Sequence, residues 1–414
     1  MEKCRKFLSE YLEMIIHKKI SIVDAARKLG YTPQWLGQIK KRYIKEGAAC
    51  LQHGNKFKPS HRKIADDIRK KIVTLYCAKY EGINFRYFST CLKTDENITG
   101  VSYWTVKSIL EAAGLKSPEA HKIKKHKEVH RPRLRREHEG DLIQIDGTPY
   151  EFFWKFGNKN KYDCHGSIDD ATGKITGLYM TQNECLYGYL EILRQTCLKY
   201  GVPSEIYSDR AAIFCVTPRE KQNLTAWEAL AGIHDKRTQW QRVLSDLNIK
   251  QTLAWSPQAK GRVERMWETV QGRLPMFLFL RGADTVEKAN KVLPEFIEQF
   301  NNEFAVEPAK KDSYYLPVPS NLNEILCAQI PRKTDHTGSL SFHSYKFTIQ
   351  NCIENVAYKN ILLCINESGM FARLNGHDYP LKLNDPYIAA GDVPQVLEDI
   401  IYRYMYAYAK EISA

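Results

Sequence analysis

Residues 141–154, "DLIQIDGTPYEFFW", decide the fold of the central part of this chain. Their alternation of apolar and polar side chains is typical of a β-strand, and we expect Asp146 to close that strand. The residues before 141 are strongly basic and lack such alternation. A folded domain of a new type therefore begins at about residue 141.

The sequence after this strand continues with elements of both kinds. "YDCHGSIDDATGKITGLYMTQ" (162–182) predicts a hairpin about an Asp-Ala-Thr-Gly turn, and "GYLEILRQTCLKYG" (188–201) predicts a helix that Gly201 ends. "PSEIYSDRAAIF" (203–214) predicts a short strand that stops at an acid, and "WSPQAKGRVERMWETVQ" (255–271) leads into another helix. Strand, hairpin, helix, strand and helix indicate a mixed α/β domain, which we place at 141–325.

Three acids occupy informative positions in this domain, namely Asp146, Asp209 and Glu264. Strands of one sheet bring their ends together, and a helix packed beside them can add a third carboxylate. Such carboxylates repel one another unless a cation neutralises them. Oxygen ligands with open positions suit Mg²⁺ or Mn²⁺, and two ions would support an in-line phosphodiester displacement.

Each acid also has a simpler explanation. Asp169 and Asp170 precede Ala-Thr-Gly and are most simply turn residues. Asp209 alone could be a helix cap, and Glu268, one helical turn beyond Glu264, is the second candidate for the third ligand. Local pairs with arginine would explain Glu264 and Glu268 as parts of a solvated helix face.

Two helical regions precede the central domain. Residues 1–55 combine a leading helix with two short helices joined by a glycine-containing turn, which predicts a helix-turn-helix. Its second helix, about 33–45, leaves three side chains available for a DNA major groove: Gln34, Gln38 and Lys41. Residues 56–115 repeat the plan with a longer loop, and their last helix presents Tyr103 and Lys107. A structural helical bundle is the alternative for both regions.

Positive charge is concentrated between these helices and the central domain. Residues 116–140 form a basic arm with too few apolar residues to fold alone, so we expect it to extend along phosphates. The basic residues assigned to DNA in this arm are Lys124, Lys125, Arg131, Arg133, Arg135 and Arg136. A soluble interdomain linker is the alternative. In the loop "SPQAKG" and the residues after it, Lys260 and Arg262 are assigned to DNA phosphates as well.

The C-terminal part returns to alternating patterns. Segments within 330–385 alternate as the strands of a small β-barrel, with glycines and asparagines at the turns. Residues 386–414 contain a tyrosine-rich amphipathic helix. The fold class that follows is multidomain α+β: helical N-terminal domains, an α/β core and a small C-terminal β-barrel.

Composition restricts the partners. The formal net charge is +13 and the pI is about 9.0 over 414 residues, which favours nucleic acid as the polyanion, although ribosome-associated and lipid-binding proteins share such charge. Eleven cysteines include no CxxC pair, so structural zinc is not expected. Since no apolar run reaches membrane-spanning length, we expect a cytoplasmic or nucleoid protein without a membrane partner.

Four stretches together carry a family resemblance. "QIDGTPY", "IDDATGKI", "YSDRAAIF" and "SPQAKGRVERMWETVQGRL", behind helix-turn-helix segments, resemble the DDE catalytic core of bacterial insertion-sequence transposases, most closely the ISNCY group. The resemblance covers about residues 20–320. It implies an RNase H-like, retroviral-integrase-like core, with Asp146, Asp209 and Glu264 as the three metal-binding catalytic acids.

The resemblance also implies a function. It is that of a DNA transposase that binds terminal inverted repeats and catalyses metal-dependent strand cleavage and strand transfer. The partners it implies are double-stranded DNA, at transposon ends and target, and a homo-oligomer of at least two subunits. The interval between Asp209 and Glu264 is longer than in the retroviral pattern, which predicts an insertion in "VTPREKQNLTAWEALAGIHDKRTQWQ" (216–241).

Two rival functions remain open on the sequence. A metal-dependent nuclease would cut nucleic acid without strand transfer, and a domesticated DNA-binding regulator would keep the fold without the chemistry. Acids at all three expected positions count against the regulator. Strand transfer from a pre-cut DNA end would separate a transposase from a nuclease.

Overall fold

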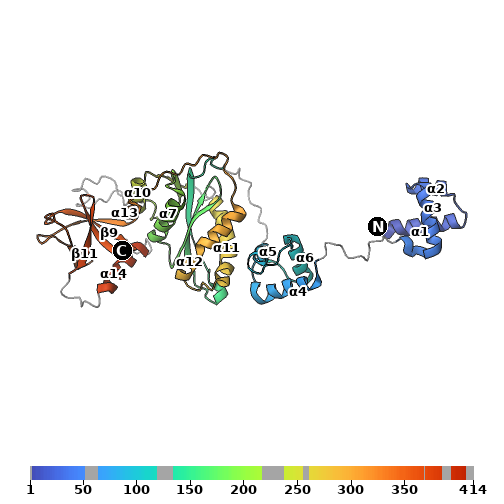
Figure 1. The fold of residues 1–414 in the computed structure, drawn as a ribbon, viewed down its shortest axis with the longest axis horizontal. Coiled ribbons are helices and arrows are strands. Elements are labelled where there is room, and N and C mark those ends of the chain that lie inside the picture. Colours follow the sequence, from blue (N-terminus) through green and yellow to red (C-terminus); the bar gives the residue numbers. More distant parts are fainter. Residues whose placement is uncertain are drawn as a thin grey trace. The chain divides into compact units, whose positions relative to one another are not determined.

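The computed structural model describes residues 2–51, 64–118, 134–216, 237–254, 261–367, 369–384 and 393–406. The chain forms two compact units, which are described separately (Figure 1). One comprises residues 1–79 and 98–115, and the other comprises 80–97 and 116–414. The predicted range 56–115 is thus divided between the units, and the six predicted domain ranges stay a prediction.

The first unit is helical throughout its described part. Its helices are α1 (Glu2–Ile16), α2 (Ile22–Leu29), α3 (Pro33–Glu46), α4 (Asp66–Leu75) and α6 (Tyr103–Ala112), with a short 3₁₀ helix at Gly47–Leu51. Ser21 and Thr32 cap α2 and α3, and Gly30 adopts the left-handed conformation (φ 71°) that ends α2. Leu12, Ala26 and Leu36 join the three N-terminal helices in one small core. The predicted helix-turn-helix elements are therefore present in 1–51.

The second unit contains a five-stranded mixed sheet. Its strands are β1 (Leu142–Tyr150), β2 (Tyr162–Asp169), β3 (Ile175–Thr181), β4 (Glu205–Ser208) and β5 (Lys250–Leu253), in the order β3-β2-β1-β4-β5. The first three strands pair antiparallel, whereas β4 and β5 extend the sheet in parallel with β1. Asp146 does not close β1 as expected. The strand continues to Tyr150 because β2 is long enough to pair with it from Tyr162 onward.

Helices cover both faces of this sheet (Figure 1). On one face α7 (Leu186–Tyr200) and α10 (Gln239–Asp246) share a core with Ile143, Ile145 and Ile206. On the other face α11 (Gly261–Leu280) and α12 (Val286–Phe304) pack on alternate residues of β2 and β3. The sheet therefore has helices packed on both of its faces.

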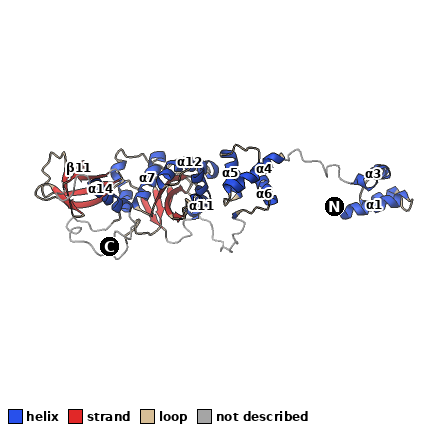
Figure 2. Cartoon of the chain, turned by 90° about the horizontal axis from the view of Figure 1, so that it is seen from below, coloured by secondary structure: helices blue, strands red, loops and turns tan. Residues whose placement is uncertain are grey.

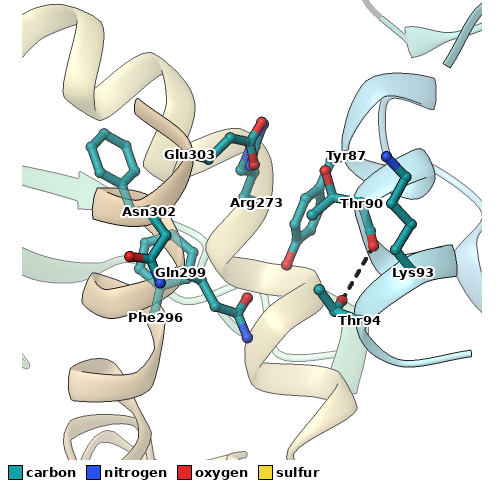
Figure 3. Close-up of a pocket in the computed structure, with 10 residues that line it drawn as sticks. Tyr87, Thr90, Lys93, Thr94, Arg273, Phe296, Gln299, Asn302 and Glu303 are labelled. Atoms are coloured by element: carbon teal, nitrogen blue, oxygen red, sulfur yellow. Dashed lines mark hydrogen bonds and ion pairs between the residues drawn. The ribbon is translucent and has the colours of Figure 1, made fainter. Parts of the chain in front are cut away.

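Helix α5 (Phe85–Thr94) belongs to this second unit and packs against α11 and α12. The guanidinium of Arg273 lies 5.0 Å from the ring of Tyr87 and 4.6 Å from that of Phe304, and it forms two hydrogen bonds with Glu303, of 2.6 and 2.9 Å. A cavity of about 480 Å³ opens beside these side chains, between α5 and the two core helices (Figure 3). Arg281 adds an ion pair of 2.8 Å to Asp95. Residues 80–97 are thus fastened to the core by charge as well as by apolar packing.

The C-terminal part of the second unit is a separate antiparallel sheet, drawn in red beside the first in Figure 2. Its strands are β6 (Ala328–Lys333), β7 (Ser339–Phe342), β8 (Tyr345–Ile349), β9 (Asn360–Asn366), β10 (Gly369–Leu374) and β11 (His377–Leu383), in the order β6-β9-β10-β11-β8-β7. The short helix α13 (Leu322–Ile325) precedes it, and α14 (Val393–Ile401) with a π-helical turn to Tyr406 follows it. This nearly closed, barrel-like sheet agrees with the alternation in the sequence.

Candidate active site

The register of the five-stranded sheet relates two of the predicted acids. In the parallel pair β1–β4, Leu142 lies opposite Glu205 and Gln144 lies opposite Tyr207. The same register, continued by two residues, brings Asp146 level with Asp209, the residue directly after β4. Asp146 shares a face of β1 with Gln144 and Thr148, since alternate residues of a strand share a face. Asp209 follows the last residue of β4, so the continued register predicts that these two acids, far apart in the sequence, lie near each other on neighbouring strands.

Helix α11 lies along this face of β1. The backbone N–H of Val263 donates to Oε1 of Gln144 at 3.3 Å, and Nε2 of Gln271 donates to Oγ1 of Thr148 at 2.8 Å. Asp146 lies midway between Gln144 and Thr148 on the same face of the strand. The helix that carries Glu264 therefore runs past Asp146.

Glu264 lies in the first turn of α11 and is exposed, as is Glu268 one turn later. Among the described residues, no three His, Cys, Asp or Glu side chains lie close enough together to hold a metal ion. Residues 255–260, directly before α11, fall outside the described part. The structure therefore brings the two aspartates to one level and places Glu264 on the adjacent helix, without assembling the three carboxylates into a metal cage.

The buried side chain of Tyr189 interacts electrostatically with both Asp146 and Asp209. Tyr189 of α7 donates its hydroxyl to Oε1 of Glu184 at 2.6 Å. Burial raises the pKa of Tyr189 well above its usual value, and the charges of Glu184, Asp146 and Asp209 raise it further. Asp146 and Asp209 are therefore both close enough to Tyr189 to disfavour its ionisation.

Asp209 also has the simpler role weighed on the sequence. Its Oδ1 accepts the backbone N–H of Ala211 at 2.8 Å, which is the geometry of an Asx turn. The hydrogen bond fixes the carboxylate just after β4 and uses one of the roughly four lone-pair sites that a carboxylate offers. Capping and metal binding are therefore compatible at this residue.

The predicted DNA-binding side chains of the helical unit lie on its surface. Gln34, Gln38 and Lys41 are exposed on α3, beyond the buried Leu36. On α6, Tyr103 and Lys107 are half-buried, and the Lys107 ammonium lies 5.6 Å from the ring centre of the neighbouring Trp104. The exposed surface of α3 thus carries all three of the side chains predicted for a DNA groove.

The basic residues near the core are found in two situations. Four of the arm and one of the loop lie outside the described residues: Lys124, Lys125, Arg131, Arg133 and Lys260. The other three contact the core, because Arg135 donates to the carbonyl of Ala171, Arg136 pairs with Glu205 at 2.9 Å, and Arg262 pairs with Asp170 at 2.7 Å. The phosphate contacts predicted for these residues stay a prediction.

Sequence reasoning missed two polar residues beside the acids. Gln144 is 1% exposed and Asp170 is fully buried, and Nε2 of Gln144 donates to Oδ1 of Asp170 at 2.9 Å. The position of Gln144 inside the apolar run "LIQI" could have indicated a buried polar role for this residue. Nothing in the pair Asp169–Asp170 showed that the second carboxylate reaches beyond its own turn.

Comparisons with known proteins were made on sequence and on structure. No protein-family model matches the chain. Over 385 residues the chain is 30% identical to the putative transposase y4bF of Sinorhizobium fredii (strain NBRC 101917 / NGR234), covering 91% of this chain and 80% of the relative. Over 375 residues it is 28% identical to the transposase for insertion sequence IS1202 of Streptococcus pneumoniae, covering 83% and 77%.

Among solved structures, the HTLV-2 integrase catalytic core domain in complex with magnesium matches at 18% identity. The match covers 42% of this chain and 94% of that one, with a TM-score of 0.28.

Proposed function

The chain belongs to the family of insertion-sequence transposases, and from that premise we propose that it binds the terminal inverted repeats of a mobile element, cuts the DNA there and joins the ends to target DNA. The enzyme class is that of DDE transposases. The observation that carries the proposal is the register of β1 and β4, which, continued beyond its paired residues, supports Asp146 and Asp209 as neighbours, with α11 packed along β1.

The catalytic acids of the proposal are Asp146, Asp209 and Glu264. Their carboxylate oxygens are donors of the kind that Mg²⁺ or Mn²⁺ prefers, and three carboxylates brought together would repel one another without a cation. Two bound ions would activate a water or a 3′-hydroxyl and stabilise the leaving oxygen in an in-line displacement. The aspartates hold their positions through the sheet, whereas Glu264 reaches the site from the first turn of α11.

The finer architecture is part of the same proposal. A five-stranded mixed sheet with helices on both faces supports an RNase H-like core, and the six-stranded sheet supports a small C-terminal barrel. Among the described residues, no helix is long and apolar enough to cross a membrane. We place the chain on bacterial DNA in the cytoplasm, associated with the nucleoid and working as an oligomer of at least two subunits.

DNA recognition is divided between two kinds of contact. The exposed side chains of α3, with Tyr103 and Lys107 of α6, are assigned to the transposon ends, where base-edge contacts give sequence preference. The basic arm and the loop before α11 are assigned to phosphates, which add affinity without sequence information.

A strand-transfer assay tests the function. The full-length chain is incubated with Mg²⁺, a pre-cut DNA end from the bordering inverted repeat, and a supercoiled target. The proposal predicts covalent joining of the 3′ end to the target. Cutting of DNA without any joined product would support a nuclease instead, and end binding without cutting or joining would support a regulator.

A further inference from the structure

The buried carboxylate of Asp170, in the turn between β2 and β3, contacts three other segments of the core. Its Oδ1 accepts hydrogen bonds from Nε of Arg262 at 2.7 Å and from Nε2 of Gln144 at 2.9 Å. Its Oδ2 accepts the backbone N–H of Arg136 at 2.8 Å. One side chain thus joins α11, β1 and the end of the basic arm.

The turn itself is held by the preceding residue. Asp169 accepts the backbone N–H and the hydroxyl of Thr172 through Oδ1, at 2.7 and 2.8 Å, and the backbone N–H of Gly140 through Oδ2, at 2.9 Å. A second buried carboxylate carries a desolvation cost that turn formation does not require. The partners of Asp170 therefore indicate a task beyond the turn.

These partners hold the first turn of α11. Arg262 is tied to Asp170, and the backbone of Val263 is tied to Gln144, which Asp170 in turn fixes. Glu264 is the next residue of the helix. Because Asp146 lies two residues beyond Gln144 on the same face of β1, the network fixes the helical turn that carries Glu264 relative to the strand that carries Asp146.

The basic arm enters the same network. The backbone of Arg136 binds Asp170, and its guanidinium pairs at 2.9 Å with Glu205, at the start of the strand that leads to Asp209. The end of the arm is therefore bound directly to the strand that leads to Asp209 and, through Asp170 and Arg262, to the helix that carries Glu264.

We infer that Asp170 is a positioning residue for catalysis, which, with Gln144 and Arg262, fixes the first turn of α11 so that Glu264 can complete the metal site. The inference rests on the proposed function, in which Glu264 is a metal-binding carboxylate. On this inference Arg262 has a partner inside the protein, Asp170, and its role is not confined to DNA phosphates.

The test compares Asp170→Asn with Asp169→Asn in the full-length chain. Both carboxylates are fully buried in one turn. That of Asp169 accepts hydrogen bonds from Thr172 and Gly140, whereas that of Asp170 accepts one from Arg262 of α11. Strand transfer from a pre-cut end is measured over a Mg²⁺ titration and again in Mn²⁺, together with DNA-end affinity and thermal unfolding.

Asp170→Asn is expected to raise the Mg²⁺ concentration for half-maximal transfer about 10- to 100-fold, as loss of a group that orients a metal ligand does, with partial recovery in Mn²⁺ and nearly unchanged end binding. Asp169→Asn is expected to lower thermal stability and keep the wild-type Mg²⁺ requirement. A wild-type requirement in folded Asp170→Asn, or an equal shift in both variants, overturns the inference.

If Asp170→Asn does not fold, Arg262→Lys replaces it, since lysine keeps the charge but not the planar geometry of the pair. A raised Mg²⁺ requirement with normal end affinity supports the positioning role, and weaker end binding with a normal Mg²⁺ requirement overturns it. Glu264→Gln separates the two proposals. Activity of Glu264→Gln at the wild-type level would remove Glu264 from the proposed metal site, and with it the premise of the inference, whereas an inactive Glu264→Gln beside an unshifted Asp170→Asn refutes only the positioning role.

Discussion

Replacement of Gly166 by alanine should displace α11 and slow strand transfer. Gly166 lies in β2 directly opposite Asp146. A methyl group there would lie 2.7 Å from Cε of Met266 and 2.7 Å from Cη2 of Trp267. Carbon atoms in contact normally keep about 3.5–4.0 Å. The Met266 terminus can turn away, but the buried indole of Trp267 is part of the packed face of α11, so the helix itself must move by roughly 1 Å.

The magnitude follows from two opposed effects. Overpacking of a core costs about 1–3 kcal/mol, and replacing glycine by alanine within a strand returns about 0.5–1 kcal/mol. We therefore expect a net loss of about 1–2 kcal/mol in the free energy of unfolding. A displacement of this size at a catalytic helix can lower the rate about 100-fold, so strand transfer should fall far more than stability.

The assay pairs this variant with Gly272→Ala on α11. A methyl group at Gly272 would lie no closer than 3.6 Å to a neighbour, the Nδ2 of Asn84, which is an ordinary contact. That variant should be as stable as the parent or slightly more so, with full activity. Calorimetry and single-turnover strand transfer give the two readings. Wild-type stability and rate in Gly166→Ala would refute the packing argument.

Three further predictions concern other parts of the chain. Replacing Gln34 and Gln38 by alanine should relax preference among end sequences by about 1–3 kcal/mol per lost base contact, measured by competition binding; an unchanged preference would remove α3 from base recognition. Burial, followed by the charge of Glu184, raises the pKa of Asp163 to about 6. The folded state therefore favours the protonated acid, and the free energy of unfolding of the wild type falls as the pH rises from about 4 to about 6. Denaturant unfolding at pH 5 and pH 7 should therefore show Asp163→Asn gaining stability relative to the wild type, and a constant difference would contradict this. Asn290→Ala should cost about 1–3 kcal/mol and promote aggregation, because the Asn290 amide binds the backbone N–H and carbonyl of Met180 on the edge strand β3; calorimetry and light scattering would test both.

Local patterns in the sequence predicted much of the framework. The helices of 1–51, the β2–β3 hairpin and strand β4 with its terminal Asp209 agree with the structure, since caps, turn residues and alternation are local signals. Strand β5 and helices α10 and α12 were not predicted. β5 has only four residues, and its role is to pair with β4, which composition alone does not reveal.

The candidate site, like the fold, could be predicted from the sequence only in part. Strand and helix ends, together with the family resemblance, selected Asp146, Asp209 and Glu264 in the sequence, and their joint role stays a prediction. The links through Gln144 and Asp170 could not be predicted, because they join residues far apart in the chain through a buried polar network. The packing of α5 on the core could not be predicted for the same reason, because Tyr87 and Arg273 come into contact only in the folded chain.

The most direct test of the account is single-turnover cleavage and joining by Asp146→Asn, Asp209→Asn and Glu264→Gln in Mg²⁺, with Glu268→Gln as the matched control. Glu268 is exposed on α11 one turn after Glu264. Each of the first three variants should lose cleavage and joining while DNA-end binding stays within a few-fold of the wild type, and Glu268→Gln should remain active. Substantial cleavage by any of the three would remove that residue from the catalytic site, and an inactive Glu268→Gln beside an active Glu264→Gln would move the third acid one helical turn along α11.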